Sequence, residues 1–309
     1  MRLISLILLF LLSGTVSAQK VEWYTTTQTS PWVKQKVKPE RVTTGAEIVL
    51  DPTLRLQLIM GIGGCFNEMG WDALNALSAE DREAVLQAIF SKDGACFNYC
   101  RLPMGANDFA LSFYSSADVA GDFNLVNFNI DRDRYILIPY IKAARQINPD
   151  LRIWASPWCP PAWMKTNNHY SSAVRPSGEK DVNGLLPREA ITEFSTGFRM
   201  EEGYLKTYAD YFARFIKAYE AEGLPLECIH VQNEPCSNQV FPSCKWRTED
   251  LTFFLGHYLG PTFERENIKT DIYFGTINTS NPDYVRTALR DEQAAKYIKG
   301  VGFQWDGKK

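Results

Sequence analysis

The chain has 309 residues, and its 33 Lys and Arg against 36 Asp and Glu give a formal net charge of −3. This near balance excludes the broad basic field that nucleic acid or an anionic membrane surface attracts, so we expect no nucleic-acid partner. The length suits one large α/β domain, alone or with a small appendage.

The first eighteen residues have the pattern of a cleavable export signal. Arg2 supplies positive charge, residues 4–12 are mostly apolar, and Val16-Ser17-Ala18 ends the segment with small residues. The apolar stretch is too short to span a membrane, and no later stretch is long and apolar enough. We therefore expect cleavage after Ala18, a secreted or periplasmic protein, and no transmembrane segment.

Seven Cys leave at least one thiol free or paired with another chain, and the oligomeric state stays open. Cys96 and Cys100 lie on one predicted strand, about 13 Å apart, which is too far for a bridge. Cys236 and Cys244 flank a short loop and are candidates for a disulfide in an oxidising compartment, with buried thiols as the alternative.

Residues 19–59 contain strand signals and no helix pattern. Residues 21–27 are rich in β-branched and aromatic side chains, and two further predicted strands, 46–50 and 54–60, are separated by Asp51-Pro52. We expect these residues to form a β appendage that is separate from the rest of the chain.

From Met60 onward, predicted strands alternate with predicted helices. The strands are 60–66, 96–102, 151–156, 228–233, 271–276 and 301–305. The helices are 79–91 with a Ser78–Asp81 cap, 133–147, 205–219, one from Thr248 that ends by Gly260-Pro261, and one that opens at Asn281-Pro282. This alternation predicts a parallel sheet, either doubly wound or a (β/α)8 barrel of which six units are present.

Polar and aromatic side chains follow the ends of these strands, where active sites of parallel α/β folds lie. Glu234 stands at the mouth of a buried strand that Pro235 terminates, and partial desolvation there suits a general acid. The other candidates are Arg101, Asn107, Asp108, Phe109, Trp158, Trp163, Asn233, Trp305 and Asp306. Carboxylates, amides and indole rings at one edge suit a polyhydroxylated ligand.

Structural readings of the same residues remain open. Arg101 and Asp108 can be an ion pair that only stabilises the fold, Trp158 can plug the end of a barrel, and Glu234 can be an ordinary loop residue. Gly61-Ile62-Gly63-Gly64 lacks the third glycine of a dinucleotide site, and the three His are too dispersed for a helical zinc motif. We therefore expect no cofactor and no metal, and we interpret His230 as a core residue.

Taken together, these residues resemble glycoside hydrolase family 30, the glucosylceramidase-like glycosidases, from about Ala46 to the last residue. The motifs that carry the resemblance are Gly61-Ile62-Gly63-Gly64, Arg101-Leu102-Pro103-Met104, Asp108-Phe109, Ala155-Ser156-Pro157-Trp158, Asn233-Glu234-Pro235 and residues 292–296. The resemblance implies a (β/α)8 TIM barrel with a flanking β-sandwich. Residues 60–309 would supply barrel strands one to six, and residues 19–59 the amino-terminal sandwich strands.

The resemblance also implies roles for single residues. Glu234 would be the general acid/base, and Asn233 would bind the hydroxyl next to the anomeric carbon. Asp108 would hold hydroxyls at the far side of the ring, and Arg101 would brace the carboxylate network. The implied substrate-binding set is Arg101, Asp108, Phe109, Trp158, Asn233, Phe241 and Trp305, with the two tryptophans packing on the sugar and Phe241 on the aglycone side.

Two departures from the family pattern stand out. The chain has Gln304-Trp305-Asp306 where the family has His-Trp-Tyr, and the family's nucleophilic Glu belongs to a seventh barrel strand that these residues do not include. A retaining glycosidase needs two carboxyl groups about 5–5.5 Å apart. We therefore expect a truncated copy of a longer enzyme, inactive and poorly stable by itself.

The expected function is that of a retaining β-glycosidase acting on β-glucosides, with β-1,6-glucan or glucosylceramide as substrate. The alternative is a carbohydrate-binding protein that keeps the aromatic edge and has lost catalysis. A third reading, an unrelated α/β enzyme such as a dehydrogenase, is disfavoured by the missing cofactor motif.

Overall fold

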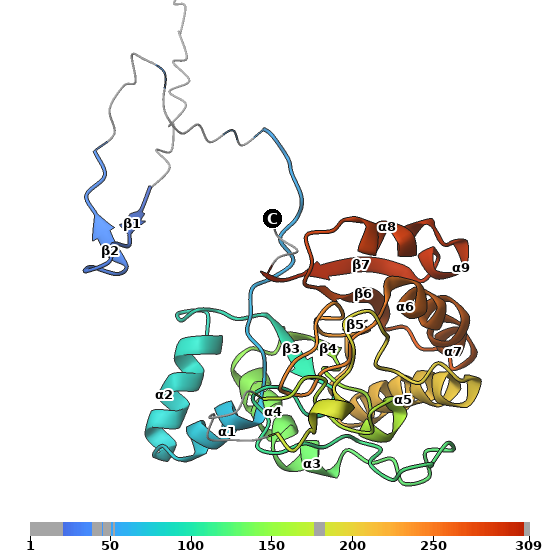
Figure 1. Ribbon diagram of the computed structural model, residues 1–309. Coiled ribbons are helices and arrows are strands. Elements are labelled where there is room, and N and C mark those ends of the chain that lie inside the picture. Colours follow the sequence, from blue (N-terminus) through green and yellow to red (C-terminus); the bar gives the residue numbers. More distant parts are fainter. Residues whose placement is uncertain (1–20, 39–44, 46–50, 52, 176–182, 306–309) are drawn as a thin grey trace, which may run out of the picture. The chain divides into compact units, whose positions relative to one another are not determined.

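The computed structural model describes residues 21–38, 45, 51, 53–175 and 183–305. The predicted signal peptide, the predicted strand 46–50 and Asp306 lie outside these residues. The chain divides into two units, Met1–Leu58 and Ile59–Lys309. In the first, strands β1 (Trp23–Thr25) and β2 (Val33–Gln35) pair antiparallel (Figure 1). This confirms a strand within residues 21–27, and the β-sandwich stays a prediction.

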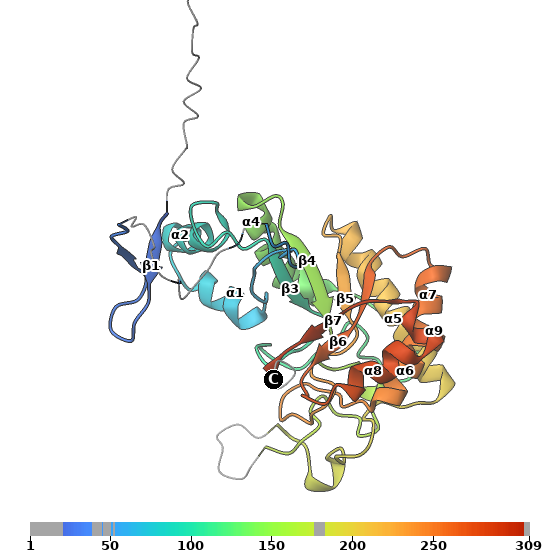
Figure 2. The same cartoon turned by 90° about the horizontal axis from the view of Figure 1, so that it is seen from above.

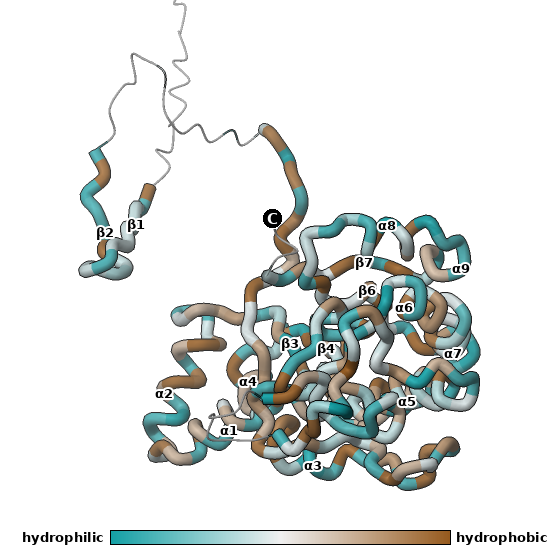
Figure 3. Tube along the Cα trace, in the orientation of Figure 1, coloured by the Kyte–Doolittle hydropathy of each residue, from teal (hydrophilic) through white to brown (hydrophobic). Residues whose placement is uncertain are grey.

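The predicted strand 54–60 is wrong, because none of these residues is paired in a sheet. Apolar and polar residues alternate here, as the brown and teal stretches of the tube in Figure 3 show. The apolar residues are largely exposed, from 53% at Met60 to 81% at Leu58. Alternation identifies a segment that can form a strand, but a strand also needs a neighbour for its backbone hydrogen bonds.

A parallel sheet of five strands forms the centre of the second unit. The strands β3 to β7 are neighbours in the same order as in the chain, and their alternation with helices corresponds to part of a barrel (Figures 1 and 2). The strands are β3 (Tyr99–Pro103), β4 (Arg152–Ser156), β5 (Cys228–His230), β6 (Asp271–Ile277) and β7 (Ile298–Phe303).

The first predicted strand of the barrel, 60–66, is reduced to a single parallel bridge between Cys65 and Arg101. The backbone nevertheless runs along β3, since Arg101 N donates to Gly64 O and Phe66 N donates to Arg101 O, both at 2.9 Å. The Ile62 amide instead donates to the side-chain Oδ1 of Asn98 at 2.9 Å. A side-chain acceptor therefore replaces the backbone partner that a regular strand would have.

The helices lie outside the sheet, with α1, α2 and α4 beside its β3 end and α5 to α9 along β5 to β7 (Figure 2). They are α1 (Glu68–Asn75), α2 (Ala79–Phe90), α3 (Asp131–Tyr135), α4 (Leu137–Ile147), α5 (Glu202–Ala221), α6 (Thr248–Phe254), α7 (Gly260–Arg265), α8 (Asp283–Arg290) and α9 (Glu292–Ala295). Short 3-10 turns cover Ala162–Met164 and Pro187–Glu189. The Ser78 cap is confirmed by the bond from Asp81 N to Ser78 Oγ at 3.1 Å, whereas α1 was not predicted.

The predicted helix end at Gly260-Pro261 is wrong. A π-helical turn, Leu255–Leu259, joins α6 to α7, and the helical path continues to Arg265. Pro261 is the second residue of α7, directly after the π-helical turn. Proline is tolerated in the first turn of a helix, where its missing amide donor is not needed. Gly260 is required for packing, because a Cβ there would lie 2.1 Å from the ring of Tyr297.

The core of the second unit is rich in aromatic side chains from α5 and its neighbours. The predicted apolar face of α5 is confirmed, because all six of its side chains are buried: Leu205, Tyr208, Phe212, Phe215, Ile216 and Tyr219. Tyr208 stacks on Phe254 with ring centroids 5.3 Å apart, and Phe254 in turn stacks on Trp246. Such burial supplies most of the favourable free energy of folding.

All seven cysteines are free thiols, and the disulfide considered between Cys236 and Cys244 is therefore wrong in this structure. Cys244 is completely buried beside apolar neighbours. This agrees with the alternative that was considered for it, a buried structural thiol. No helix within the described residues has the length and apolar character needed to cross a bilayer.

Candidate active site

The site is built where the backbone leaves the carboxyl end of β5. Asn233 N donates to Pro157 O, which follows β4, at 2.8 Å, and Glu234 N donates to Thr276 O of β6 at 3.2 Å. Successive residues are thus bonded to the strands on either side. Glu234 has a φ of 46°, in the left-handed region that non-glycine residues seldom occupy. Such strain is concentrated at functional positions.

The carboxylate of Glu234 has an N–H donor on each oxygen. Trp305 Nε1 donates to Oε1 at 2.6 Å, and Gln239 Nε2 donates to Oε2 at 3.0 Å. Glu234 is 9% exposed, while Trp305, at the end of β7, is 72% exposed. One edge of the indole therefore holds the carboxylate, and much of the ring remains open to a ligand. Gln239 was not predicted, and its position five residues after Glu234 is no signal by itself.

Asn233 is oriented through its side-chain oxygen. Oδ1 accepts hydrogen bonds from Arg101 Nη2 at 2.8 Å, Gln304 Nε2 at 3.1 Å and Thr276 Oγ1 at 3.2 Å. Because these donors occupy the oxygen, the amide nitrogen is the part of Asn233 that a ligand hydroxyl can use. Thr276 and Gln304 contribute to the site through this contact, and neither was among the predicted binding residues.

Arg101 braces the site from β3. Its Nε and Nη2 both lie near Ser156 Oγ, at 3.0 and 2.6 Å, and its guanidinium carbon is 3.8 Å from the ring centroid of Trp158. Burial lowers the pKa of Arg101 to about 10, and the negative charges of Asp108 and Glu234 oppose that shift. The guanidinium therefore stays charged at neutral pH.

Trp158 and Trp163 are both largely buried, Trp158 under Arg101 with 6% of its surface exposed. Trp163 donates its indole N–H to Ala117 O at 2.8 Å, which is a structural contact. Arg101 has Ser156 and Asn233 as its hydrogen-bond partners, so its role is different from the simple ion pair considered with Asp108.

Asp108 and Phe109 are exposed on the loop that follows β3, and Phe241 is half-buried. Although the residue as a whole is exposed, its carboxyl group is partly shielded from water, which raises the pKa of Asp108, and Arg101 opposes this shift. Next to them, Asn107 accepts the Phe109 amide on Oδ1 at 3.0 Å, while its buried Nδ2 has no hydrogen-bond partner. The contacts around Glu234 thus join Arg101, Trp158, Asn233 and Trp305, but they do not reach Phe109 or Phe241.

His230 lies below the site as a core residue, as predicted. Its Nδ1 is 2.9 Å from Gly275 O, and its ring packs between those of Trp154 and Tyr273. Burial lowers the pKa of His230 to about 4, so the ring is neutral at neutral pH. Within the described part of the chain, no cluster of three His, Cys, Asp or Glu residues is suited to a metal ion.

The chain matches the model of the glycosyl hydrolase family 30 TIM-barrel domain over residues 59–184 and 190–308. It is 27% identical to the lysosomal acid glucosylceramidase of Mus musculus, over 87% of this chain and 50% of that protein. It is also 27% identical to the endo-1,6-beta-D-glucanase of Neurospora crassa, over 82% and 48% of the two chains. The chain spans about half the length of these curated relatives.

The chain is also similar to solved structures. The crystal structure of SrfJ from Salmonella typhimurium has a TM-score of 0.73 and 28% identity, with 89% of this chain and 57% of that chain covered. A solved endo-beta1,6-glucanase has a TM-score of 0.71 and 26% identity, with 91% and 59% covered.

Proposed function

We propose that this chain, which belongs to glycoside hydrolase family 30, supplies the acid/base residue of a retaining glycosidase that hydrolyses β-glucosides. The observation that carries the proposal is the placement of Glu234. Its carboxyl group is almost buried at the carboxyl end of β5 and is held by N–H donors on both oxygens. A fixed, poorly solvated carboxyl group is suited to proton transfer.

In this mechanism Glu234 donates a proton to the departing glycosidic oxygen while a second carboxylate attacks the anomeric carbon. Glu234 then takes a proton from the water that hydrolyses the glycosyl-enzyme. Asn233, with its Oδ1 engaged by Arg101, presents its amide to the hydroxyl beside the anomeric carbon. Asp108 would hold hydroxyls on the far side of the ring, and Trp305 would offer the free part of its indole to the apolar face of the sugar.

The substrate class rests on the relatives. One relative is named a glucosylceramidase and another an endo-1,6-beta-D-glucanase, and the two have the same sequence identity to this chain. A β-linked glucose is common to the two substrates, so we propose a β-glucoside. We place β-1,6-glucan first and glucosylceramide second. The signal-like residues 1–18 support export of the protein, and detection of the cleaved chain outside the cytoplasm would test that part.

Glu234→Gln, made in a protein that joins this chain to a strand bearing the second carboxylate, tests the proposal with aryl β-glucosides as substrates. Removing the proton donor should lower kcat by about 10²–10⁴-fold. The loss should be larger for phenyl than for 2,4-dinitrophenyl β-glucoside, because the better leaving group needs less protonation. Glu227→Gln is the matched control, since Glu227 precedes the same strand and pairs with Arg152 at 3.2 Å.

Unchanged hydrolysis by Glu234→Gln would refute the proposal. If the parent protein that also carries the second carboxylate binds glucosides without any turnover, the carbohydrate-binding alternative is favoured.

A further inference from the structure

The loop of residues 107–118, called here the Asp108 loop, connects β3 to the region before α3 and carries Asp108 and Phe109. It is bonded to the first turn of α1 at two places. Met69 N donates to Phe109 O at 3.1 Å, and Leu111 N donates to Glu68 Oε2 at 2.8 Å. The two bonds lie one and three residues after Asp108, so α1 limits the positions that this part of the loop can take.

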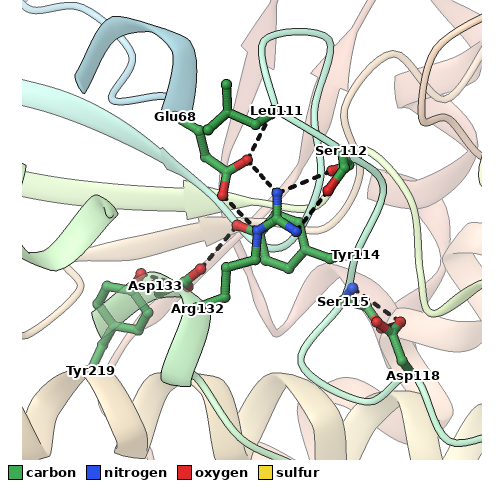
Figure 4. Close-up of polar contacts among 9 residues, drawn as sticks. All are labelled: Glu68, Leu111, Ser112, Tyr114, Ser115, Asp118, Arg132, Asp133 and Tyr219. Carbon is green, nitrogen blue, oxygen red and sulfur yellow. Dashed lines mark hydrogen bonds and ion pairs between the residues drawn. The ribbon is translucent and has the colours of Figure 1, made fainter. Parts of the chain in front are cut away.

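Glu68 is in turn held by Arg132 of α3 (Figure 4). Arg132 Nε is 2.7 Å from Glu68 Oε1 and Nη2 is 2.7 Å from Oε2, which is the two-pronged geometry of the strongest Arg–carboxylate pairs. Glu68 is 2% exposed. Arg132 Nη1 also donates to Ser112 Oγ at 2.8 Å. One guanidinium therefore binds both the helix residue that holds the loop and the loop itself.

The base of Arg132 is fixed as well. The next residue, Asp133, is buried and accepts hydrogen bonds from Tyr114 Oη at 2.9 Å and from Tyr219 Oη of α5 at 2.7 Å (Figure 4). The guanidinium carbon of Arg132 lies 4.0 Å from the ring centroid of Tyr114. The Asp108 loop is thus fastened at residues 109, 111, 112 and 114 to α1 and α3, which are distant in sequence, and Tyr219 of α5 holds α3 in place through Asp133.

We propose that the Glu68–Arg132 ion pair is a positioning pair that sets the place of Asp108 and thereby the affinity of the site for the sugar. This deepens the proposed function and rests on it through the sugar-binding role of Asp108. Neither Glu68 nor Arg132 touches the contacts around Glu234, so the pair acts on binding rather than on proton transfer. An ion pair on the surface would contribute little to the stability of the fold. Glu68 is buried, however, so the loss of its two-pronged contact with Arg132 also disturbs the loop residues that are bonded to this pair.

The variants are Glu68→Gln and Arg132→Met, and the probe is 4-nitrophenyl β-thioglucoside, which resists hydrolysis. We expect its dissociation constant, measured by calorimetry, to rise about tenfold in each variant. Arg134→Met is the control, because Arg134 lies on the same helix and binds Glu222 at 2.7 Å and Asp131 at 2.8 Å, away from the loop. It should leave the dissociation constant unchanged.

A double-mutant cycle separates positioning from general destabilisation. In an Asp108→Asn background, Arg132→Met should weaken binding less than about twofold, because the carboxylate that it positions is already absent. An equal loss in both backgrounds would overturn the proposal. Arg132→Lys, which keeps the charge and loses the fork, should give an intermediate dissociation constant, and it carries the test if Glu68→Gln or Arg132→Met does not fold.

Measuring the hydrolysis of aryl β-glucosides alongside binding distinguishes a failure of the positioning role from a failure of the proposed function. If Glu234→Gln abolishes turnover and Arg132→Met leaves binding unchanged, the positioning role fails and the proposed function stands. If Glu234→Gln leaves turnover intact, the proposed function itself is refuted.

Discussion

Trp305 and Glu234 come from the ends of two different strands and meet in a hydrogen bond of 2.6 Å between the indole Nε1 and the carboxylate Oε1. Trp305 also has a φ of 46°, like Glu234, so the backbone is strained at both ends of this contact. The indole was predicted to pack on the sugar by its face. In the structure its edge orients the carboxylate that we propose as the acid/base.

Trp305→Phe removes this donor and keeps most of the aromatic surface. A hydrogen bond to a charged group contributes about 1.5–3 kcal/mol, so we expect kcat for phenyl β-glucoside to fall about tenfold or more. KM should change little. Trp32→Phe, an exposed indole in the first unit, serves as the control. A fall in affinity at constant kcat would show that the ring face, and not the N–H, is the functional part.

Asp133→Asn should flatten the dependence of stability on pH. Burial raises the pKa of Asp133 from 3.8 to about 6, against the opposing hydrogen bonds from Tyr219 and Tyr114. Because the folded state binds the proton more tightly than the unfolded state does, the stabilisation is complete below about pH 4 and is lost as pH rises through 6. The difference corresponds to about 3 kcal/mol.

Urea unfolding at pH 4, 5, 6 and 7 measures this effect. Over that range, the free energy of unfolding should fall more for the parent protein than for Asp133→Asn. The asparagine side chain can still form hydrogen bonds to both tyrosines. Asp131→Asn, an exposed neighbour paired with Arg134, should keep the slope of the parent. Identical slopes for the parent and Asp133→Asn would contradict the prediction.

Lys165→Met should destabilise the loops that surround the site. The ammonium group is completely buried, and its three N–H groups share four acceptor oxygens, which are Tyr170 O at 2.9 Å, Ser171 O at 3.2 Å, Ser172 Oγ at 3.2 Å and Ser243 O at 2.6 Å. Methionine fills a similar space but removes these buried hydrogen bonds, at a cost of about 3 kcal/mol.

The free energy of unfolding in urea is again the measurement. Lys206→Met, which removes an exposed lysine paired with Glu202 on α5, should change it by less than about 0.5 kcal/mol. Equal changes in the free energy of unfolding at the two lysines would show that the buried contacts of Lys165 do not contribute to stability.

Gly63→Ala and Gly64→Ala should differ although the two glycines are adjacent. A Cβ at position 63 would lie 2.1 Å from the carbonyl oxygen of Tyr99, and one at position 64 would lie 3.4 Å from the ring of Phe97. The first contact is with the backbone of β3 and cannot be relieved by a side-chain movement. We expect Gly63→Ala to cost about 2 kcal/mol or more in thermal unfolding and Gly64→Ala clearly less.

Most elements of the second unit could be predicted from sequence because their signals are local. The amphipathic face of α5, the Ser78 cap and the strand endings at Pro103 and Pro157 each depend on residues a few positions apart. The exposed segment 54–60 and the helix that continues through Pro261 could not be predicted. The first depends on the presence of a neighbouring strand, and the second on Tyr297 packing against Gly260.

The sequence by itself determined that Glu234 stands at the carboxyl end of a buried parallel strand. The apolar pattern of that strand and the proline that ends it are both found in consecutive residues. Only the tertiary structure decided what surrounds that carboxylate. Trp305 and Gln239 hold it, and Glu68 meets Arg132 below the Asp108 loop, through hydrogen bonds between residues up to 71 positions apart. Such contacts are fixed by how strands and helices pack in three dimensions, and no local pattern along the chain encodes them.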